Sequence, residues 1–204
     1  GSLLARRPTA IGLARLSPRR VFPPGGTALY RHVARLAELG PEQEFLVVPC
    51  GRGVTAQFLA EVSKATGSGV DPNPELTKAA TARARAANLS GRLHFEDGSL
   101  IDLPYQDEVF DVSIGEIGLA AVEDPAKAVR ELVRVTKPMG TVLLLQLTWN
   151  TSVEPERHDV LVESLGVRPH LLVEWKQMLR EAGAVDLYVE DWSDAMALLR
   201  EPWS

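Results

Sequence analysis

Cysteine is almost absent from this chain of 204 residues, which contains only Cys50. A single thiol excludes an internal disulfide and any Cys-x-x-Cys metal pair. Because small secreted domains often depend on disulfides, the shortage favours a cytoplasmic protein. The four histidines also lack the paired spacing that holds a metal ion, so the sequence predicts no metal site.

Long apolar runs and an excess of positive charge are missing as well. The longest apolar runs, such as residues 141–147, are far shorter than the roughly 20 residues that cross a bilayer. The Arg-rich start has no long apolar core and does not resemble a secretory signal. The net charge is −5, whereas nucleic-acid-binding domains are usually basic. We therefore expect a small-molecule substrate and neither a nucleic acid nor a membrane partner, and the oligomeric state is left open.

The chain does contain a regular alternation of short β-rich runs and helical periods. Strands are predicted at residues 45–48, 67–70, 93–96, 109–114, 141–147 and 185–190. Helices are predicted at residues 28–39, 54–65, 74–87, 125–135 and 168–182. Thr27 and Asp124 are the expected N-caps of the first and fourth helices, and Pro125 suits the first helical position. The alternation predicts an α/β, Rossmann-like, doubly wound and mostly parallel sheet with helices on both faces.

Three regions follow from this pattern. Residues 1–24 are rich in proline and arginine and read as an N-terminal arm with a short helix at 10–16. Residues 25–192 form the predicted α/β domain. Residues 193–204 form a C-terminal tail, with a short helix expected at 194–199 in place of a further strand.

A glycine-rich turn directly follows the first predicted strand. It reads Gly51-Arg52-Gly53, and Ala56 completes the G-x-G-x-x-A pattern of dinucleotide-binding loops. Asp71 ends the second strand, where an acid can accept hydrogen bonds from a ribose diol. In an open parallel sheet, ligands bind at the carboxyl ends of the strands. The turn and the acid together predict a cofactor that contains adenosine.

Three segments further along the chain distinguish among such cofactors. Residues 99–105 read Ser-Leu-Ile-Asp-Leu-Pro-Tyr, residues 110–112 read Phe-Asp-Val, and residues 131–140 read Glu-Leu-Val-Arg-Val-Thr-Lys-Pro-Met-Gly. In this order they resemble segments of the class I S-adenosylmethionine-dependent methyltransferases. The resemblance covers residues 25–190 and is strongest to the small-molecule branch with the ubiquinone/menaquinone C-methyltransferases and arsenite methyltransferases. An NAD-dependent oxidoreductase has no comparable support, because no Tyr-x-x-x-Lys pair is evident.

The resemblance implies S-adenosylmethionine as cofactor and a role for individual positions. Gly51 and Gly53 would line its methionine part, and Asp71 would bind the ribose hydroxyls. Glu116, just after the fourth strand, would face the sulfonium and the substrate. The other implied cofactor contacts are Pro72 and Asn73 beside the adenine, Ser99 and Leu100 at the adenine edge, and Asp97 as a substitute for Ser99. The catalytic residues stay open, with Glu116, Tyr30 and His32 as candidates.

Two departures from the family pattern affect the first loop. The family usually has an acid where this chain has Val47 and a glycine where it has Pro49. Proline has no backbone N–H and fixes φ near −65°. Three alternatives follow: the cofactor still binds, the site takes another ligand, or the domain keeps the fold without the activity. If it binds, methyl transfer proceeds by in-line displacement, which depends mainly on holding the reactants in line.

Overall fold

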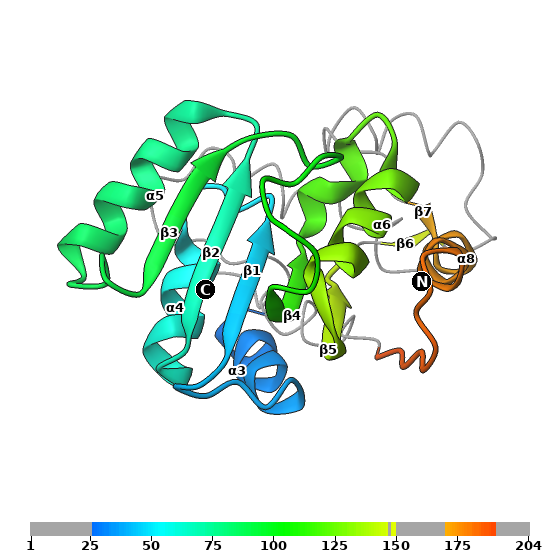
Figure 1. The fold of residues 1–204 in the computed structure, drawn as a ribbon, viewed down its shortest axis with the longest axis horizontal. Helices are drawn as coiled ribbons and strands as arrows, with labels where there is room; N and C mark the ends of the chain where they lie inside the picture. The colour runs from blue at the N-terminus through cyan, green and yellow to red at the C-terminus, as the bar shows by residue number, and fades with distance from the viewer. Residues whose placement is uncertain (1–25, 147, 150–169, 191–204) are drawn as a thin grey trace, which may run out of the picture.

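A parallel sheet of five strands forms the centre of the molecule in the computed structural model, which describes residues 26–146, 148–149 and 170–190. The strand order is β3-β2-β1-β4-β5 (Figure 1). The strands are β1 (Glu44–Val48), β2 (Thr66–Asp71), β3 (Leu93–Asp97), β4 (Phe110–Gly115) and β5 (Thr136–Leu144). The predicted Rossmann-like α/β class is therefore confirmed.

Helices cover both faces of this sheet, as expected (Figure 1). One layer holds α3 (Gly26–Leu36), α4 (Val54–Ser63) and α5 (Pro74–Ala86). The other layer holds the 3-10 helix η1 (Ile117–Ala121), α6 (Pro125–Val135) and α8 (Leu172–Glu181).

Strand β1 contributes to two separate cores because successive side chains point to opposite faces. Phe45 and Val47 pack in the core beneath α3 and α4, while Leu46 and Val48 pack in the core beneath α6 and α8. All four side chains are buried, with exposed fractions of 1% or less. This double burial explains why the strand is a continuous apolar run and not an alternating one.

The helix starts follow local capping chemistry. Asp124 accepts a hydrogen bond from the Lys127 N–H at 3.0 Å, which confirms it as the N-cap of α6. Asn73 caps α5 in the same way, accepting from the Glu75 N–H at 3.0 Å. Helix α3 already includes Gly26, so the prediction that Thr27 is its N-cap was wrong.

Strand order reverses between β1 and β4, and this reversal positions the site. The chain runs from β1 through β2 to β3 on one side and then returns to place β4 and β5 on the other. The loops after β1 and β4 consequently leave the sheet in opposite directions. Such a switch point is where open α/β sheets bind ligands.

Two predicted features of the later chain differ from the structure. Strand β5 begins at Thr136, not at residue 141, because Phe110 pairs with Thr136 before an irregularity and Val112 then pairs with Thr141. Pro138 lies in the intervening stretch, where its missing N–H removes no regular ladder bond.

The sixth strand predicted at residues 185–190 was wrong. These residues have no regular secondary structure, and Val185 and Tyr188 are largely exposed. A second, two-stranded parallel sheet instead pairs β6 (Thr148–Trp149) with β7 (His170–Leu171). Apolar and polar side chains alternate at residues 185–190, but no described strand pairs with this segment. It therefore does not form a strand.

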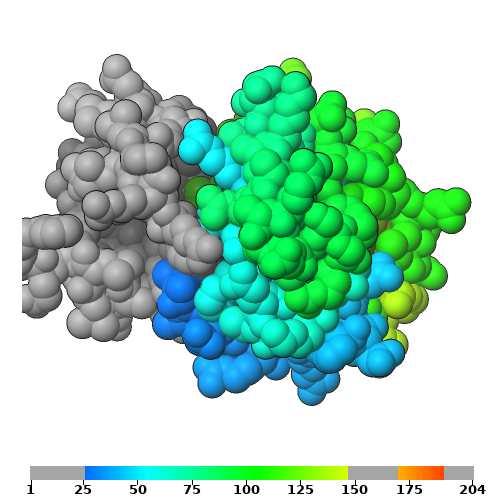
Figure 2. Space-filling model, turned by 90° about the vertical axis from the view of Figure 1, so that its left-hand side faces the viewer, coloured from blue at the N-terminus to red at the C-terminus, as the bar shows by residue number. Residues whose placement is uncertain are grey.

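The predicted arm at residues 1–24 and tail at 193–204, with their short helices, lie outside the described residues. None of the described helices is long and apolar enough to cross a membrane. Figure 2 views the left-hand side of Figure 1, where α5 and β3 form the surface in teal and green.

Candidate functional site

The turn after β1 brings backbone close to an open space at the switch point. Gly51 has φ +53°, and a Cβ there would meet no atom within 4 Å. Gly53 has φ +81° and occupies the N-cap position of α4, where no side chain caps the helix. The N-cap residue therefore supplies no side-chain acceptor for the first amides of α4.

Gly53 has a packing role that the sequence did not indicate. A Cβ at this position would lie 3.0 Å from the Cβ of Ala80 and 3.1 Å from the ring of Phe95. Glycine therefore allows the start of α4 to approach α5 and β3 closely.

Asp71 fixes the geometry of the loop from the end of β2. Its buried carboxylate accepts the Gly51 N–H at 3.0 Å and the Asn73 N–H at 2.9 Å, one on each oxygen. A carboxylate oxygen has room for a second donor, so both oxygens can also accept from a ligand hydroxyl. Pro72 lies next to it and is exposed.

Glu116 and Tyr30 form a buried pair after β4. The Tyr30 hydroxyl lies 2.9 Å and 2.8 Å from the two carboxyl oxygens of Glu116. Burial raises the pKa of Glu116 to about 7, while hydrogen bonds from Tyr30 and Thr55 oppose that rise. Burial and the nearby carboxyl raise the pKa of Tyr30 well above its usual value, so its hydroxyl stays protonated.

Thr55 is a site residue that the sequence did not single out. It lies in the first turn of α4 and is buried. Only its position two residues after the predicted glycine turn could have drawn attention to it.

His32, the third catalytic candidate, has a different partner. Its Nε2 atom lies 2.7 Å from a carboxyl oxygen of Glu190, in the segment after α8. Because residues two apart on a helix face different directions, α3 presents Tyr30 but not His32 to Glu116.

The two departures from the family pattern occupy well-packed positions. Val47 is buried in the core beneath α3 and α4. The ring of Pro49 lies so close to Gly118 that a Cβ on Gly118 would approach it to 2.7 Å. Proline at this position removes one backbone donor from the loop.

Cys50 lies inside the same loop and is not an activated nucleophile. Burial and the nearby Asp71 raise the pKa of its thiol to about 12, so the thiol stays protonated at neutral pH. It acts as a small packed side chain whose Cβ faces Gly69 closely.

A network of hydrogen bonds made by Arg134 and Glu131 holds the loop after β3, and the sequence motif did not reveal these contacts. Arg134 donates to Glu131, to Asp107 and to the carbonyl oxygens of Tyr105 and Leu103. Glu131 also accepts the Leu103 N–H at 2.8 Å. The predicted family segment at residues 131–140 thus supports the loop of the segment at 99–105.

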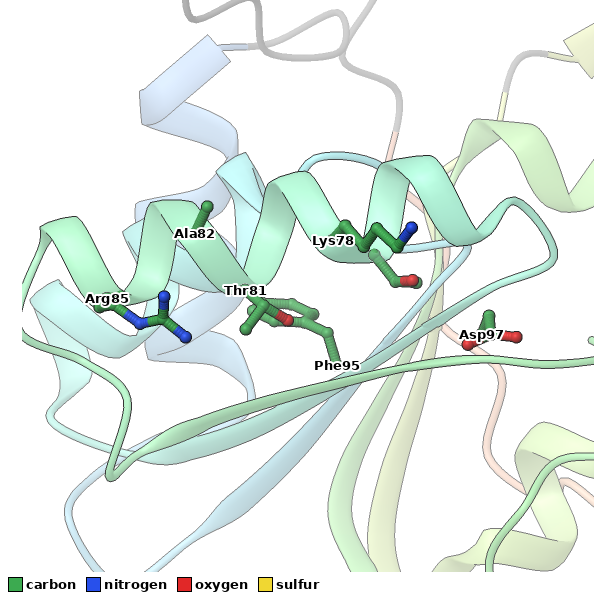
Figure 3. A pocket seen from close by; sticks show the side chains of 7 residues that line it. Lys78, Thr81, Ala82, Arg85, Phe95 and Asp97 are labelled. Carbon is green, nitrogen blue, oxygen red and sulfur yellow. The ribbon is translucent and has the colours of Figure 1, made fainter.

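The predicted adenine contacts lie at the start of this loop. Leu100 is buried, and the Ser99 hydroxyl accepts the Ile101 N–H at 3.2 Å. Asp97 is exposed at one end of an open groove between α5 and β3, with Arg85 toward the other end (Figure 3). Thr77 and Lys78 line the same groove.

In the described part of the chain, no group of three or more His, Cys, Asp or Glu residues is arranged to hold a metal ion. The described polar groups at the switch point include Asp71, Glu116, Tyr30 and Thr55, together with backbone amides of the loop after β1.

Comparisons with known proteins agree with this arrangement. Residues 46–144 match the family described as Methyltransferase domain. An uncharacterised protein of Haemophilus influenzae is 30% identical over 195 residues, covering 92% of this chain and 75% of that protein. The ubiquinone/menaquinone biosynthesis C-methyltransferase UbiE of Rickettsia bellii is 28% identical over 186 residues, covering 78% of this chain and 75% of the enzyme.

A solved structure shows the same fold. Geranyl diphosphate C-methyltransferase from Streptomyces coelicolor A3(2), in complex with S-adenosyl-L-homocysteine, superposes with a TM-score of 0.71 at 16% identity. The match covers 76% of this chain and 59% of that one. The family match and the relatives show that this chain belongs to the class I S-adenosylmethionine-dependent methyltransferases and resembles their small-molecule branch.

Proposed function

We propose that this protein transfers the methyl group of S-adenosylmethionine to a small-molecule acceptor by in-line displacement. One observation carries the proposal: Gly51, Asp71 and Glu116 lie at the carboxyl ends of the neighbouring strands β1, β2 and β4, and Gly51 faces open space. Family membership supports the cofactor. The cofactor supplies a methyl group that is already activated on sulfur, so the protein mainly has to position the reactants.

The residues present fit this cofactor. The open position at Gly51 would admit its methionine part, with the uncapped start of α4 nearby. Asp71 retains acceptor capacity for the ribose hydroxyls. Leu100 and Ser99 would border the adenine, and Pro72 and Asn73 would lie beside it. Asp97, the substitute for Ser99, lines the open groove between α5 and β3.

A methyltransferase-fold domain without catalytic activity is the second candidate. It is favoured by Pro49, which removes a donor from the loop after β1 and packs against Gly118. Calorimetric titration of the full chain with S-adenosylmethionine, S-adenosylhomocysteine and NAD separates the two. We expect micromolar binding of the first two compounds and none of NAD, whereas no binding of any would favour the inactive domain.

Replacing Asp71 by alanine tests where the cofactor binds. We expect the dissociation constant for S-adenosylmethionine to rise about ten-fold or more, because the ribose hydroxyls lose a charged acceptor. The change also removes the acceptor that holds the Gly51 N–H, which adds to the loss.

Glu42→Ala is the matched control for this titration. Glu42 is an exposed carboxylate at the opposite end of β1, so its removal changes the net charge equally without touching the site. We expect unchanged affinity. Equal affinity of Asp71→Ala and the wild type would show that the ribose does not lie at the end of β2.

A further inference from the structure

Glu116 is a buried carboxyl group that has no cationic partner among the described residues. Its exposed fraction is 7%, and its hydrogen-bond donors are the neutral hydroxyls of Tyr30 and Thr55. No lysine, arginine or histidine forms an ion pair with it in the part of the chain that the structure describes. Removing one charge from water without a counter-charge is costly, so this carboxylate favours a ligand that brings a positive charge.

Glu116 follows the strand that pairs with Val47, the position in β1 where the family usually has an acid. Val47 pairs with Ile114, and the Glu116 N–H donates to the carbonyl oxygen of Val48 at 2.8 Å. Since side chains alternate along a strand, Val47, Ile114 and Glu116 face the same side of the sheet. That side carries α3 and α4, from which Tyr30 and Thr55 reach the carboxyl.

We propose that Glu116 binds the ammonium group of the cofactor, replacing from β4 the carboxylate that β1 lacks at Val47, with Tyr30 and Thr55 as positioning residues. The inference rests on the proposed function, because it assumes that the cofactor's methionine part enters beside Gly51. In this arrangement the carboxylate comes from the end of β4 instead of from β1, on the same face of the sheet.

Proton linkage gives this proposal a measurable signature. The free carboxyl has a pKa of about 7, so near neutral pH about half of the molecules carry a proton there. A bound ammonium stabilises the carboxylate and expels that proton. Below pH 7, binding must therefore compete with the proton and weakens as the pH falls.

Among the described residues, no other group in contact with the carboxyl titrates in this range. From α3 it meets Tyr30, whose pKa is far above neutral, and from α4 it meets Thr55. The amide of Gln146, after β5, donates to the Glu116 carbonyl oxygen. On β1 the neighbouring residues are apolar. The ligand's own α-amino group, with a pKa of roughly 8, stays protonated below pH 7.

The test is calorimetric titration with two ligands at pH 6 and pH 7. S-Adenosylhomocysteine carries the ammonium, whereas 5′-methylthioadenosine shares its adenosine part and lacks the amino-acid part. For the wild type, we expect the affinity for S-adenosylhomocysteine to be about five-fold higher at pH 7 than at pH 6. The affinity for 5′-methylthioadenosine should not depend on pH.

Two variants complete the design. In Glu116→Gln, we expect S-adenosylhomocysteine binding at pH 7 to weaken about ten-fold or more and to lose its pH dependence, while 5′-methylthioadenosine binding is unchanged. In Tyr30→Phe, the ring packing stays but a hydrogen bond to the carboxylate is lost. Its pH dependence should persist with a midpoint moved to higher pH, which a purely structural role of Tyr30 would not produce.

The outcomes separate this inference from the proposed function. Normal binding of S-adenosylhomocysteine by Glu116→Gln would overturn the ammonium role and leave the cofactor site intact. An equal loss of both ligands in Glu116→Gln would overturn it too, because the effect would then not depend on the ammonium. If the wild type bound neither ligand, the proposed function itself would fail and the inference with it.

Discussion

Replacing Glu116 by glutamine is expected to stabilise the ligand-free protein at pH 8 by about 3 kcal/mol. Burial raises the pKa of this carboxyl from 4.5 to about 7 in the folded protein. The pKa of this carboxyl is higher in the folded protein than in the unfolded chain. Its neutral form therefore contributes its full stabilisation below pH 4.5. That stabilisation is lost as the pH rises through 7. Glutamine stays neutral at every pH, and its amide oxygen can still accept a hydrogen bond from the Tyr30 hydroxyl.

Urea denaturation of the wild type and Glu116→Gln between pH 4.5 and pH 8 measures this effect. The difference in free energy of unfolding should be small at pH 4.5 and reach its full value near pH 8. Glu42→Gln serves as control, because this exposed carboxylate should give no such divergence. Parallel curves for the wild type and Glu116→Gln would show that Glu116 is not desolvated as the structure indicates. A variant that gains stability while losing ligand would fit the usual conflict between stability and function.

Replacing Gly67 by alanine is expected to destabilise the fold by about 3 kcal/mol. Gly67 on β2 pairs directly with Phe45 on β1, and a Cβ there would overlap the Phe45 ring. That ring is fully buried at the centre of the core beneath α3 and α4. It cannot move without displacing its neighbours, because protein interiors are close-packed.

A double-mutant cycle checks this explanation by urea denaturation. Phe45→Leu removes part of the ring volume, so the combined Gly67→Ala/Phe45→Leu loss should be smaller than the sum of the single losses. Gly91→Ala is the matched control, since a Cβ at Gly91 meets nothing within 4 Å. Additive losses, or an equal loss in Gly91→Ala, would contradict the steric explanation.

Much of the fold was predictable because its signals are local. The runs that form β1 to β4 are short, helical periods separate β1 from β2 and β2 from β3, and Asp124 begins α6 with its own side chain. Asp71 could be placed at the end of β2 and Gly51 at the turn after β1 from sequence order alone. In a parallel sheet, the carboxyl ends of the strands then meet at one edge.

The later part of the chain shows where local signals were insufficient. Residues 185–190 alternate like a strand, yet a strand forms only where a partner strand offers its backbone groups. Likewise, Thr136 joins β5 because Phe110 pairs with it, although Pro138 lies only two residues away. Both results depend on neighbours that are distant in the sequence.

The sequence by itself determined the family, the α/β class and the strand ends that carry Gly51, Asp71 and Glu116. It could not determine what those side chains contact. Tyr30 and Glu116 are 86 residues apart, and only the packing of α3 against the sheet brings the hydroxyl to the carboxyl. Strand order fixes where a residue lies, but the helices packed on the sheet decide which groups surround it and whether it meets water. Tertiary structure alone therefore set the burial and the raised pKa of Glu116 and left it without a counter-charge among the described residues.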